Sequence, residues 1–588
     1  MNMETGRKKE VKKQNIHIRD PSNESTLETD PRKVATLLNE YYTNIAVNLN
    51  QRNVEKVYQE SNFIQNSMYL SEANEADVLN AARKLKNKKS SGPDDIFDLV
   101  VKRSISQIVK PLENIINESF KQEHVPDLLK IAKIRPQFKK GDKTCPSNYR
   151  PIANISSFAK IFERVVAKKI KEFLEKYNVI NKSQFGYQNK ISTIDALINY
   201  VTNIYDGLAE KQYIKGYMLD LTKAFDLVNH SVLFSKLEQC GLRGKILGWL
   251  KSYLQNRKQF VELETIGNTI SSVQSSNISV STGVPQGSIL GPLLFILYVN
   301  DLTNNVKVGH KVMFVDDLSI VILGKTTEEL KTQENKLFSE IDNWLNANNL
   351  VEQKEKRQQI IFRTNDRKCG HKDDILASTE NKCVCLLGVN IDTQLRWSYH
   401  INILIQKLNK ACFAISRISK TCDRGTAITT YYALFHSILS YGIVLWGGTA
   451  DIKRVLIIQK KAIRYITNSS KLTSCRNLFK ILQILTAPSV YIFETLKHIR
   501  KNYEAYQKKI EIHQHNTRRK NYLEPMQNKL KISQKGINYM GPKLFNHLPQ
   551  EIQVLSINRF NQYLKALLLD KSYYSVQEFL DDDLSHIK

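Results

Sequence analysis

Apolar and polar positions along the chain follow two periods, and the shortest apolar runs surround one pair of acids. Residues 311–315 and 318–323 are short runs rich in β-branched side chains, on either side of Asp316 and Asp317. Such runs predict strands, and two strands separated by two residues predict an antiparallel hairpin. The hairpin would carry two adjacent carboxylates at its tip. A polar turn is the alternative interpretation, because Asp is common in turns.

Apolar residues repeating every three or four positions predict helices along much of the remaining chain. Ser192 followed by Asp195 predicts a helix N-cap, residues 326–329 predict a capping box, and the polar residues 1–30 are expected to be unstructured. Helices are expected at 34–49, 73–85, 156–176, 232–240, 245–258, 290–302, 401–419, 427–445 and 455–468. Strands are expected at 134–138, 213–219, 259–263, 359–362 and 385–391, with a strand-like segment at 271–281.

A third acid, Asp220, ends the predicted buried strand 213–219. If this strand end lies against the hairpin tip, three carboxylates gather, and their mutual repulsion favours binding of a divalent cation. The alternative is that Asp220 only caps the turn that follows. Asp226, further along that turn, is the better candidate for the cap and is expected to point elsewhere.

Cationic and glycine-rich segments lie near two other predicted elements. Lys139, Lys140 and Arg150 flank a predicted turn and could converge on a triphosphate, since charged hydrogen bonds to phosphate are strong; a generic basic face is the alternative. The loop 282–288 leads into the helix 290–302, and its glycines allow a backbone to approach a ligand closely. Its Gln286 could bond to a base or sugar, although the loop alone indicates only a helix entry.

Composition narrows the class of partner. The 588 residues include 86 Lys and Arg against 58 Asp and Glu, a formal net charge of +28. This excess favours a polyanion such as nucleic acid; a membrane surface or plain solubility are the alternatives. The eight cysteines form no CxxC pair, which predicts reduced thiols in an intracellular protein. The chain shows no signal peptide and no membrane-length apolar run, so we expect a nuclear or cytoplasmic protein, neither secreted nor membrane-bound.

Taken in order, the motifs resemble a reverse transcriptase of the non-LTR (LINE-type, jockey/CR1-like) retrotransposons. The resemblance is strong over about residues 80–400 and looser over about 400–550. Its motifs are Ser-Ser-Gly-Pro-Asp (90–94), Phe-Lys-Lys-Gly-Asp (138–142), Asn-Tyr-Arg-Pro-Ile (148–152), Gln-Phe-Gly-Tyr (184–187), Asp220 with Ala-Phe-Asp (224–226), Gly-Val-Pro-Gln-Gly-Ser (283–288), Phe-Val-Asp-Asp (314–317), Leu-Leu-Gly (386–388), His-Asn-Thr-Arg (515–518) and Gly-Pro-Lys-Leu-Phe (541–545).

The resemblance implies an α+β fold of the right-hand polymerase type, with fingers, a palm built on an antiparallel sheet, and a helical thumb. The implied layout is a partly disordered N-terminal extension (1–70), fingers interleaved with the palm (71–215), the palm and reverse transcriptase core (216–398), the thumb (399–500) and a basic, mainly helical C-terminal region (501–588).

The resemblance also implies a role for each candidate residue. Asp220, Asp316 and Asp317 match the catalytic acids that bind two Mg²⁺ ions, for which Mn²⁺ could substitute. Lys356 matches the proton donor to pyrophosphate. The implied substrates are an RNA template, a DNA primer or RNA–DNA hybrid, and dNTPs. The implied nucleotide-binding residues are Lys139, Arg150, the sugar-selecting Phe225, and Gln286 and Gly287, which shape the template and nucleotide pocket.

Some positions depart from the family pattern. Gln188 stands where Arg is usual, Val315 replaces Ala, and Gln353-x-x-Lys356-Arg357 replaces Asn-x-x-Lys-Thr. The first 80 or so residues are too few for the family's apurinic-type endonuclease, which would be supplied separately. A catalytically silent nucleic-acid-binding remnant of such an element is the alternative. An RNA-dependent RNA polymerase conflicts with Phe225, because a bulky residue there disfavours ribonucleotides.

Overall fold

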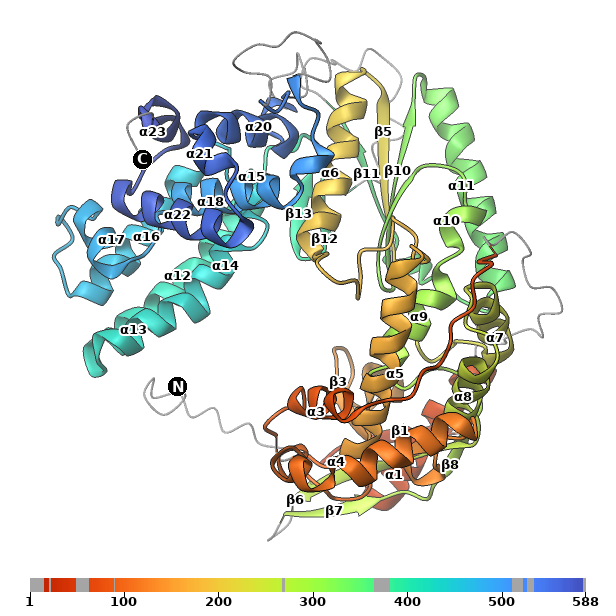
Figure 1. Ribbon diagram of the computed structural model, residues 1–588. Helices are drawn as coiled ribbons and strands as arrows, with labels where there is room; N and C mark the ends of the chain where they lie inside the picture. The colour runs from red at the N-terminus through yellow and green to blue at the C-terminus, as the bar shows by residue number, and fades with distance from the viewer. Residues whose placement is uncertain are drawn as a thin grey trace.

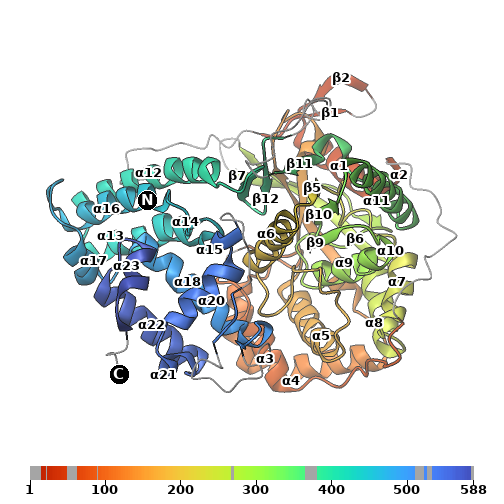
Figure 2. The same ribbon diagram turned by 90° about the horizontal axis from the view of Figure 1, so that it is seen from above.

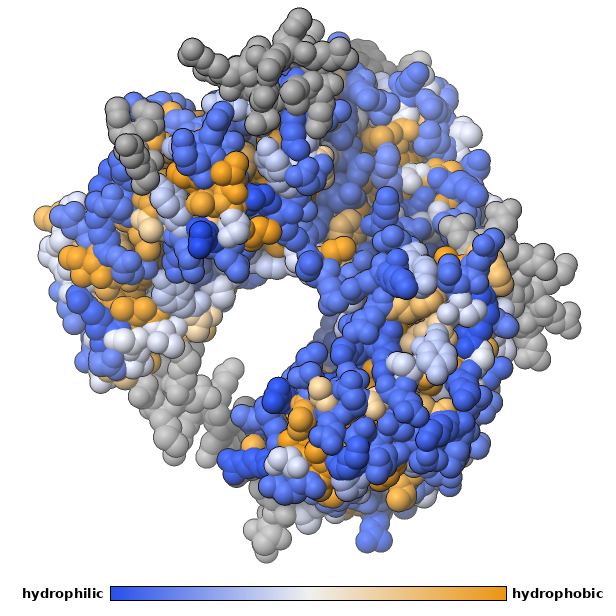
Figure 3. All heavy atoms as spheres, in the orientation of Figure 1, coloured by the Kyte–Doolittle hydropathy of each residue, from blue (hydrophilic) through white to orange (hydrophobic). Residues whose placement is uncertain are grey.

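The computed structural model describes residues 15–20, 23–48, 63–88, 90–266, 270–363, 381–509, 522–525 and 533–584. The fold mixes helices with mainly antiparallel sheets, and the helices of residues 398–584 form a lobe of their own beside the rest of the chain (Figures 1 and 2). The space-filling view shows a wide central opening rimmed largely by hydrophilic residues (Figure 3). The motif at 515–518 lies outside the described residues.

A four-stranded antiparallel sheet carries the predicted hairpin. Its order is β11-β5-β10-β9. Helix α6 (Thr193–Ala209) covers one face and α11 (Thr327–Ala347) the other (Figure 1). Side chains alternate accordingly: Tyr217 packs on Phe338 of α11, whereas Gly216 leaves room for Tyr200 of α6. The strands are β5 (Tyr213–Leu219), β9 (His310–Phe314), β10 (Asp317–Gly324) and β11 (Gln358–Phe362).

A second sheet has the order β4-β3-β6-β7, with β8 also paired to β6. The pair β3–β6 is parallel and the others are antiparallel. Helix α1 (Pro31–Thr43), followed by α2 (Ile45–Asn48), packs on β6, β7 and β8. The strands are β3 (Ile131–Phe138), β4 (Tyr149–Asn154), β6 (Arg257–Ile266), β7 (Ile270–Gln274) and β8 (Ile278–Val280).

Helices between the two sheets complete the first hydrophobic core. Nearly every residue of α9 is buried, which explains its lack of a polar face. The predicted helix 290–302 divides into α9 and α10, and the predicted helix 245–258 ends at Leu254 because β6 begins at Arg257. These helices are α3 (Glu75–Arg83), α4 (Asp98–Lys121), α5 (Ser157–Lys176), α7 (His230–Gln239), α8 (Lys245–Leu254), α9 (Gly291–Val299) and α10 (Leu302–Asn305).

The C-terminal lobe has a second core that continues past residue 500. Helix α18 packs on both α20 and α22, and Phe560 and Leu568 are fully buried there. The hairpin β12 (Cys383–Leu386) and β13 (Val389–Asp392) leads into it. The helices are α12 (Ser398–Thr421), α13 (Arg424–Thr430), α14 (Ser437–Ser440), α15 (Ile443–Trp446), α16 (Ile452–Thr467), α17 (Arg476–Leu482), α18 (Ala487–Lys501), α20 (Ile537–His547), α21 (Gln550–Gln553), α22 (Ile557–Lys571) and α23 (Val576–Asp581).

Several local predictions are wrong, each for a physical reason. Residues 18–28 are not unstructured: β1 (Ile18–Asp20) and β2 (Asn23–Glu28) form a hairpin, and the Arg19 N–H donates to the Thr144 carbonyl at 2.9 Å. The predicted strand 385–391 is the β12–β13 hairpin, because Leu387 and Gly388 adopt positive φ angles of 45° and 82°. The predicted helix 427–445 is interrupted by a π-helical turn at Tyr431–His436.

The two predicted caps have different outcomes. Ser192 and Asp195 form the full capping box at the start of α6. At α11, Thr326 accepts from the Glu329 N–H, but the Glu329 carboxylate accepts from the Lys325 N–H instead of from the Thr326 N–H.

Among the helices that the structure describes, none combines the length and the apolar character needed to cross a membrane.

Candidate functional site

The hairpin tip and the end of β5 bring the predicted acids to one place. The last pair of the β10–β5 ladder is Leu318 with Leu219. Asp317 and Asp220 are the next residues along the two strands, and Asp220 lies close enough to Asp317 for its charge to raise the pKa of Asp317. Asp316 occupies the turn between β9 and β10. The prediction that Asp220 faces the hairpin tip is therefore consistent with the register of the sheet.

The acids raise one another's proton affinity. Burial, and then the charges of Asp316 and Asp220, raise the pKa of Asp317 to about 6. Burial, and then Asp220, also raise the pKa of Asp316, which Arg150 and Lys139 partly oppose. Like charges held together in a poorly solvated place favour protonation or a bound cation. Asp316 and Asp317 therefore lie where a bound cation would be favourable.

One cation of the chain reaches into this cluster. The Lys356 ammonium lies 2.7 Å from Asp220 Oδ2, and both side chains are about one-third exposed. The Gln353 N–H donates to the Asp220 carbonyl at 2.8 Å, which fixes the start of the lysine loop against the end of β5. The Lys356 ammonium is thus held against the Asp220 carboxylate.

The departure at Arg357 stabilises the same loop. Its guanidinium donates to both carboxylate oxygens of Glu352, at 2.8 and 2.6 Å, and lies 4.0 Å from the centre of the Phe338 ring. The Glu352 side chain is almost completely buried. A bidentate pair of this kind has a defined geometry, so Arg357 anchors the loop that presents Lys356.

Two further cations face the cluster from the second sheet. Arg150 lies on β4, and Lys139 follows β3, where its N–H donates to the Asn148 carbonyl at 2.9 Å. Burial, and then the charges of Arg150 and Lys356, lower the pKa of Lys139. Arg150 and Lys356 lie close enough to Lys139 for their charges to act on it, so the three cations form a positive group near the acids.

Phe225 lies on the turn after β5, five residues beyond Asp220. Its ring stacks on Phe295 of α9, with centroids 4.7 Å apart and planes 22° from parallel. Its carbonyl accepts from the Val284 N–H at 2.8 Å. The stacking holds the aromatic ring, and the hydrogen bond holds the backbone of the turn that follows Asp220.

Gln286 and Gly287 are pinned by neighbours within the protein. The Gln286 amide donates to both oxygens of Asp226 at 2.9 Å, and the Gln286 carbonyl accepts from Ala153 of β4. Gly287 has a φ of 123°, and a Cβ there would lie 2.5 Å from the Ala153 carbonyl oxygen. The Asp226 carboxylate, predicted to cap a turn, instead holds Gln286, and burial raises its pKa to about 6.

Three residues near the site were not predicted. Tyr187 lies close enough to Asp316 for that charge to raise its pKa, after the larger effect of burial. Lys223 donates to the Tyr41 hydroxyl at 2.6 Å and lies 4.3 Å from the centre of its ring. Tyr41 is on α1, far away in sequence, so no local pattern could have indicated this contact.

The residues suit a hard divalent cation by their chemistry. Within the described part of the chain, no three His, Cys, Asp or Glu side chains are gathered closely enough, as they stand, to hold a metal ion. The donor set of Asp220, Asp316 and Asp317 nevertheless consists of the carboxylate oxygens that Mg²⁺ prefers. The Lys356 ammonium already provides positive charge to Asp220, which shows how the cluster attracts cations.

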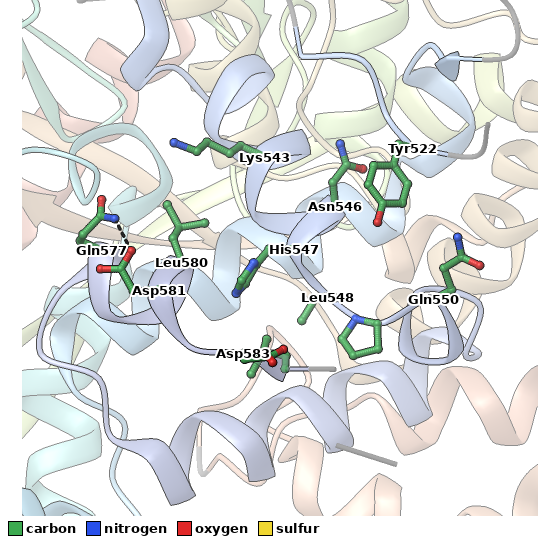
Figure 4. A pocket seen from close by; sticks show the side chains of 12 residues that line it. Tyr522, Lys543, Asn546, His547, Leu548, Gln550, Gln577, Leu580, Asp581 and Asp583 are labelled. Atoms are coloured by element: carbon green, nitrogen blue, oxygen red, sulfur yellow. Dashed lines mark hydrogen bonds between the residues drawn. The ribbon is translucent and has the colours of Figure 1, made fainter. Parts of the chain in front are cut away.

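A separate cavity of about 660 Å³ lies in the C-terminal lobe, between α20, α21 and α23 (Figure 4). Lys543, His547 and Asp583 are among the side chains that line it, and Gln577 donates to Asp581 at its edge. None of the predicted site residues lines this cavity, so it is distinct from the acidic cluster.

Carboxylates at a hairpin tip that face a group of cations suit the handling of a phosphate ester. Residues 138–391 match the family model described as reverse transcriptase (RNA-dependent DNA polymerase). This match includes every candidate site residue. Residues 138–391 are therefore similar to reverse transcriptases, as the sequence motifs predicted.

Two relatives from Drosophila melanogaster illustrate the match. The probable RNA-directed DNA polymerase from transposon X-element is 28% identical over 413 residues, which are 68% of this chain and 44% of that protein. The RNA-directed DNA polymerase from mobile element jockey is 25% identical over 448 residues, 74% of this chain and 48% of that protein. The chain thus spans about half the length of the curated relatives it matches.

Among solved structures, an apo telomerase from Candida tropicalis is similar over 48% of this chain and 59% of that chain. The identity is 13% and the TM-score 0.30, a value too low to argue for a shared fold.

Proposed function

We propose that the chain is an RNA-directed DNA polymerase that extends a DNA primer on an RNA template with dNTPs. The observation that carries the proposal is the meeting of Asp220, Asp316 and Asp317 with the cations Lys139, Arg150 and Lys356. The names of the relatives and the excess of positive charge support it.

The proposed layout is a right hand. Residues 71–215, which include β3 and β4, act as fingers interleaved with the palm. Residues 216–398, which include most of the four-stranded sheet with the acids, act as the palm. The helices of 399–500 act as the thumb, continued by the region 501–588. The central opening (Figure 3) would admit a nucleic-acid hybrid. Basic side chains bind its phosphates independently of sequence, so binding should weaken steeply as salt rises.

Asp220, Asp316 and Asp317 are the residues that would hold two Mg²⁺ ions, or Mn²⁺ in their place. Such ions supply Lewis acidity and lower the pKa of a bound hydroxyl. The residues of the chain then position the substrates for in-line displacement. Lys139 and Arg150 bind the triphosphate, and Lys356 Nζ, positioned by its pairing with Asp220, donates a proton to the leaving pyrophosphate.

Two sets of contacts shape the proposed nucleotide pocket. Phe225, held by its stacking on Phe295, lies under the incoming sugar and excludes a 2′-hydroxyl. Gln286 and Gly287 shape the floor of the template and nucleotide pocket from a loop pinned to β4 and Asp226. We propose that an endonuclease for priming is supplied separately and that the protein acts in the nucleus, the cytoplasm or both.

Primer extension on poly(rA)/oligo(dT) with Mg²⁺ tests the proposal, with Asp316→Ala as the control. We expect extension by the parent protein with dTTP, much less with UTP, and none by the variant. Binding of the hybrid without extension by the parent would instead establish the alternative, a silent nucleic-acid-binding remnant. Efficient use of UTP would contradict the role of Phe225.

A further inference from the structure

A buried glutamine lies directly behind the hairpin tip. The Gln184 side chain is 1% exposed, and its Oε1 accepts two hydrogen bonds, from the Val315 N–H at 3.0 Å and from the Gly186 N–H at 2.8 Å. Val315 immediately precedes Asp316. The glutamine therefore bonds to the backbone of the turn that carries the acids, without bonding to the acids themselves.

The segment that carries Gln184 adds an edge to β9. Gln184 pairs in parallel with Met313, whose N–H donates to Ser183 and whose carbonyl accepts from Phe185, both at 2.8 Å. Gly186 makes the close approach feasible, because a Cβ there would lie 2.6 Å from Val315 Cγ2. The segment is thus fixed to the hairpin on both sides of the glutamine.

Val315 adopts a backbone conformation that its side chain disfavours. Its φ is 64°, in the left-handed region, which β-branched residues rarely occupy. Such a conformation persists only where the surroundings impose it. The two-residue turn between Phe314 and Asp317 requires such a conformation, and the hydrogen bond from the Val315 N–H to Gln184 fixes the start of the turn in place.

We propose that Gln184 is a positioning residue, which holds Val315 in the left-handed conformation and thereby orients Asp316 and Asp317 toward Asp220. The inference rests on the proposed polymerase function for its catalytic consequence. Its structural part, the dependence of the tip on Gln184, is measurable without activity.

Hydrogen–deuterium exchange of the peptides spanning residues 310–320 tests the structural part. In Gln184→Ala the tip loses its acceptor, so we expect these amides to exchange faster than in the parent. Gln459→Ala is the matched control: Gln459 is also a fully buried glutamine with several hydrogen bonds, but it lies in the C-terminal lobe. Unchanged exchange at the tip of Gln184→Ala would overturn the proposal.

Primer extension tests the catalytic part, provided that the parent is active. Because a displacement of reacting groups by about 1 Å can lower rates by 10²-fold, we expect kcat of Gln184→Ala to fall roughly 10- to 100-fold. The affinity for the hybrid should stay unchanged, and Gln459→Ala should keep its kcat. An unchanged kcat in Gln184→Ala would refute the proposal, whereas an inactive parent would refute the polymerase function and leave the exchange result standing.

Two further variants separate positioning from general destabilisation. Val315→Gly in the Gln184→Ala background should regain part of the lost kcat, because glycine adopts the left-handed conformation without the clamp. Gln184→Glu keeps an acceptor, so its tip should stay protected, while the added charge beside Asp316 should move the acid limb of the pH profile upward. Absence of both effects would contradict the proposed mechanism, even if Gln184→Ala fails to fold.

Discussion

The two sheets of this molecule bury acids in opposite electrostatic settings. Glu262 on β6 accepts from Arg135 at 2.7 Å and lies 3.3 Å from the Lys133 ammonium. Burial alone would raise the pKa of Glu262, but these two cations hold it below its ordinary value. On the other sheet, burial and two neighbouring acids raise the pKa of Asp317 to about 6.

This difference separates acids that stabilise the fold from acids that are available to bind a ligand. A structural acid is neutralised within the protein, and removing it leaves buried partners unpaired. An acid kept among like charges destabilises the free protein and gains its compensation from what it binds. The predictions below break or sharpen this contrast, from the largest expected effect to the smallest.

Replacement of an acid at the hairpin tip should abolish activity and spare the fold. We expect Asp316→Ala to lower primer extension at least ~10³-fold, since preorganised charge at the reacting atoms is a dominant catalytic term. Its melting temperature should be equal to or above that of the parent, because a like-charge repulsion is removed. A variant that unfolds would show that Asp316 is structural.

Replacement of the paired acid should have the reverse effect. Glu262→Ala removes the buried carboxylate and leaves Lys133 with only the exposed Asp95 and Arg135 with only the exposed Glu264, so we expect a loss of about 3 kcal/mol in the free energy of unfolding. Urea denaturation measures this loss. Glu264→Ala, at an exposed partner of the same Arg135 at 3.8 Å, should cost no more than about 1 kcal/mol.

Lys356 pairs with Asp220 of the acidic cluster and is the proposed general acid. Because general-acid catalysis contributes about 10²-fold or more, we expect Lys356→Ala to reduce kcat by roughly 10²-fold with little change in hybrid affinity. Single-turnover kinetics would show the loss in the chemical step. Lys354→Ala, in the same loop, is the control and should retain the parent kcat.

The raised pKa of Asp317 predicts a defined pH dependence of stability. A folded-state pKa of about 6, above the ordinary value of 3.8, means that the folded protein binds this proton more tightly than the unfolded chain does. The group therefore costs stability above pH 6, and the cost disappears as the pH falls toward 4. We expect Asp317→Asn to be more stable than the parent at pH 7.5 and equal to it near pH 4.

Mg²⁺ provides the complementary test of that pH dependence. A cation that binds the folded parent stabilises it by mass action, so Mg²⁺ should narrow the difference from Asp317→Asn at pH 7.5 in thermal denaturation. An unchanged difference at saturating Mg²⁺ would mean that Asp317 does not contribute to cation binding.

The smallest effect is expected at the contact between α1 and the turn after β5. Tyr41→Phe removes the hydroxyl that accepts from Lys223, and a hydrogen bond of this type is worth about 1 kcal/mol. We expect a loss of about 1 kcal/mol in the free energy of unfolding, which urea denaturation measures. Tyr69→Phe, at an exposed tyrosine, should match the parent.

Features set by neighbouring residues in the chain could be predicted from the sequence. The strand before Asp220, the hairpin around Asp316 and the Ser192 cap depend on apolar alternation and on side chains a few positions away, and the structure contains all three. Helix α4 was missed, because Phe97 provides no side-chain cap and Pro111 lies within the helix.

Features created by distant contacts could not be predicted. The β1–β2 hairpin depends on a bond to Thr144, and the position of Tyr41 depends on the packing of α1 against the second sheet. Gln184 belonged to a recognised motif, but its role at Val315 depends on the close approach allowed by Gly186. In each case the stabilising partner is more than one hundred residues away.

The hydrophobic core that α18 shares with α20 and α22 determines what a premature stop codon would do to the protein. Phe560, Leu564 and Leu568 are fully buried in that core. A nonsense codon shortly after position 500 would remove these side chains. It would uncover a broad apolar surface on the remaining helices, and the shortened product should aggregate or be degraded. Residues 537–571 are therefore needed to cover the apolar surface of the preceding helices.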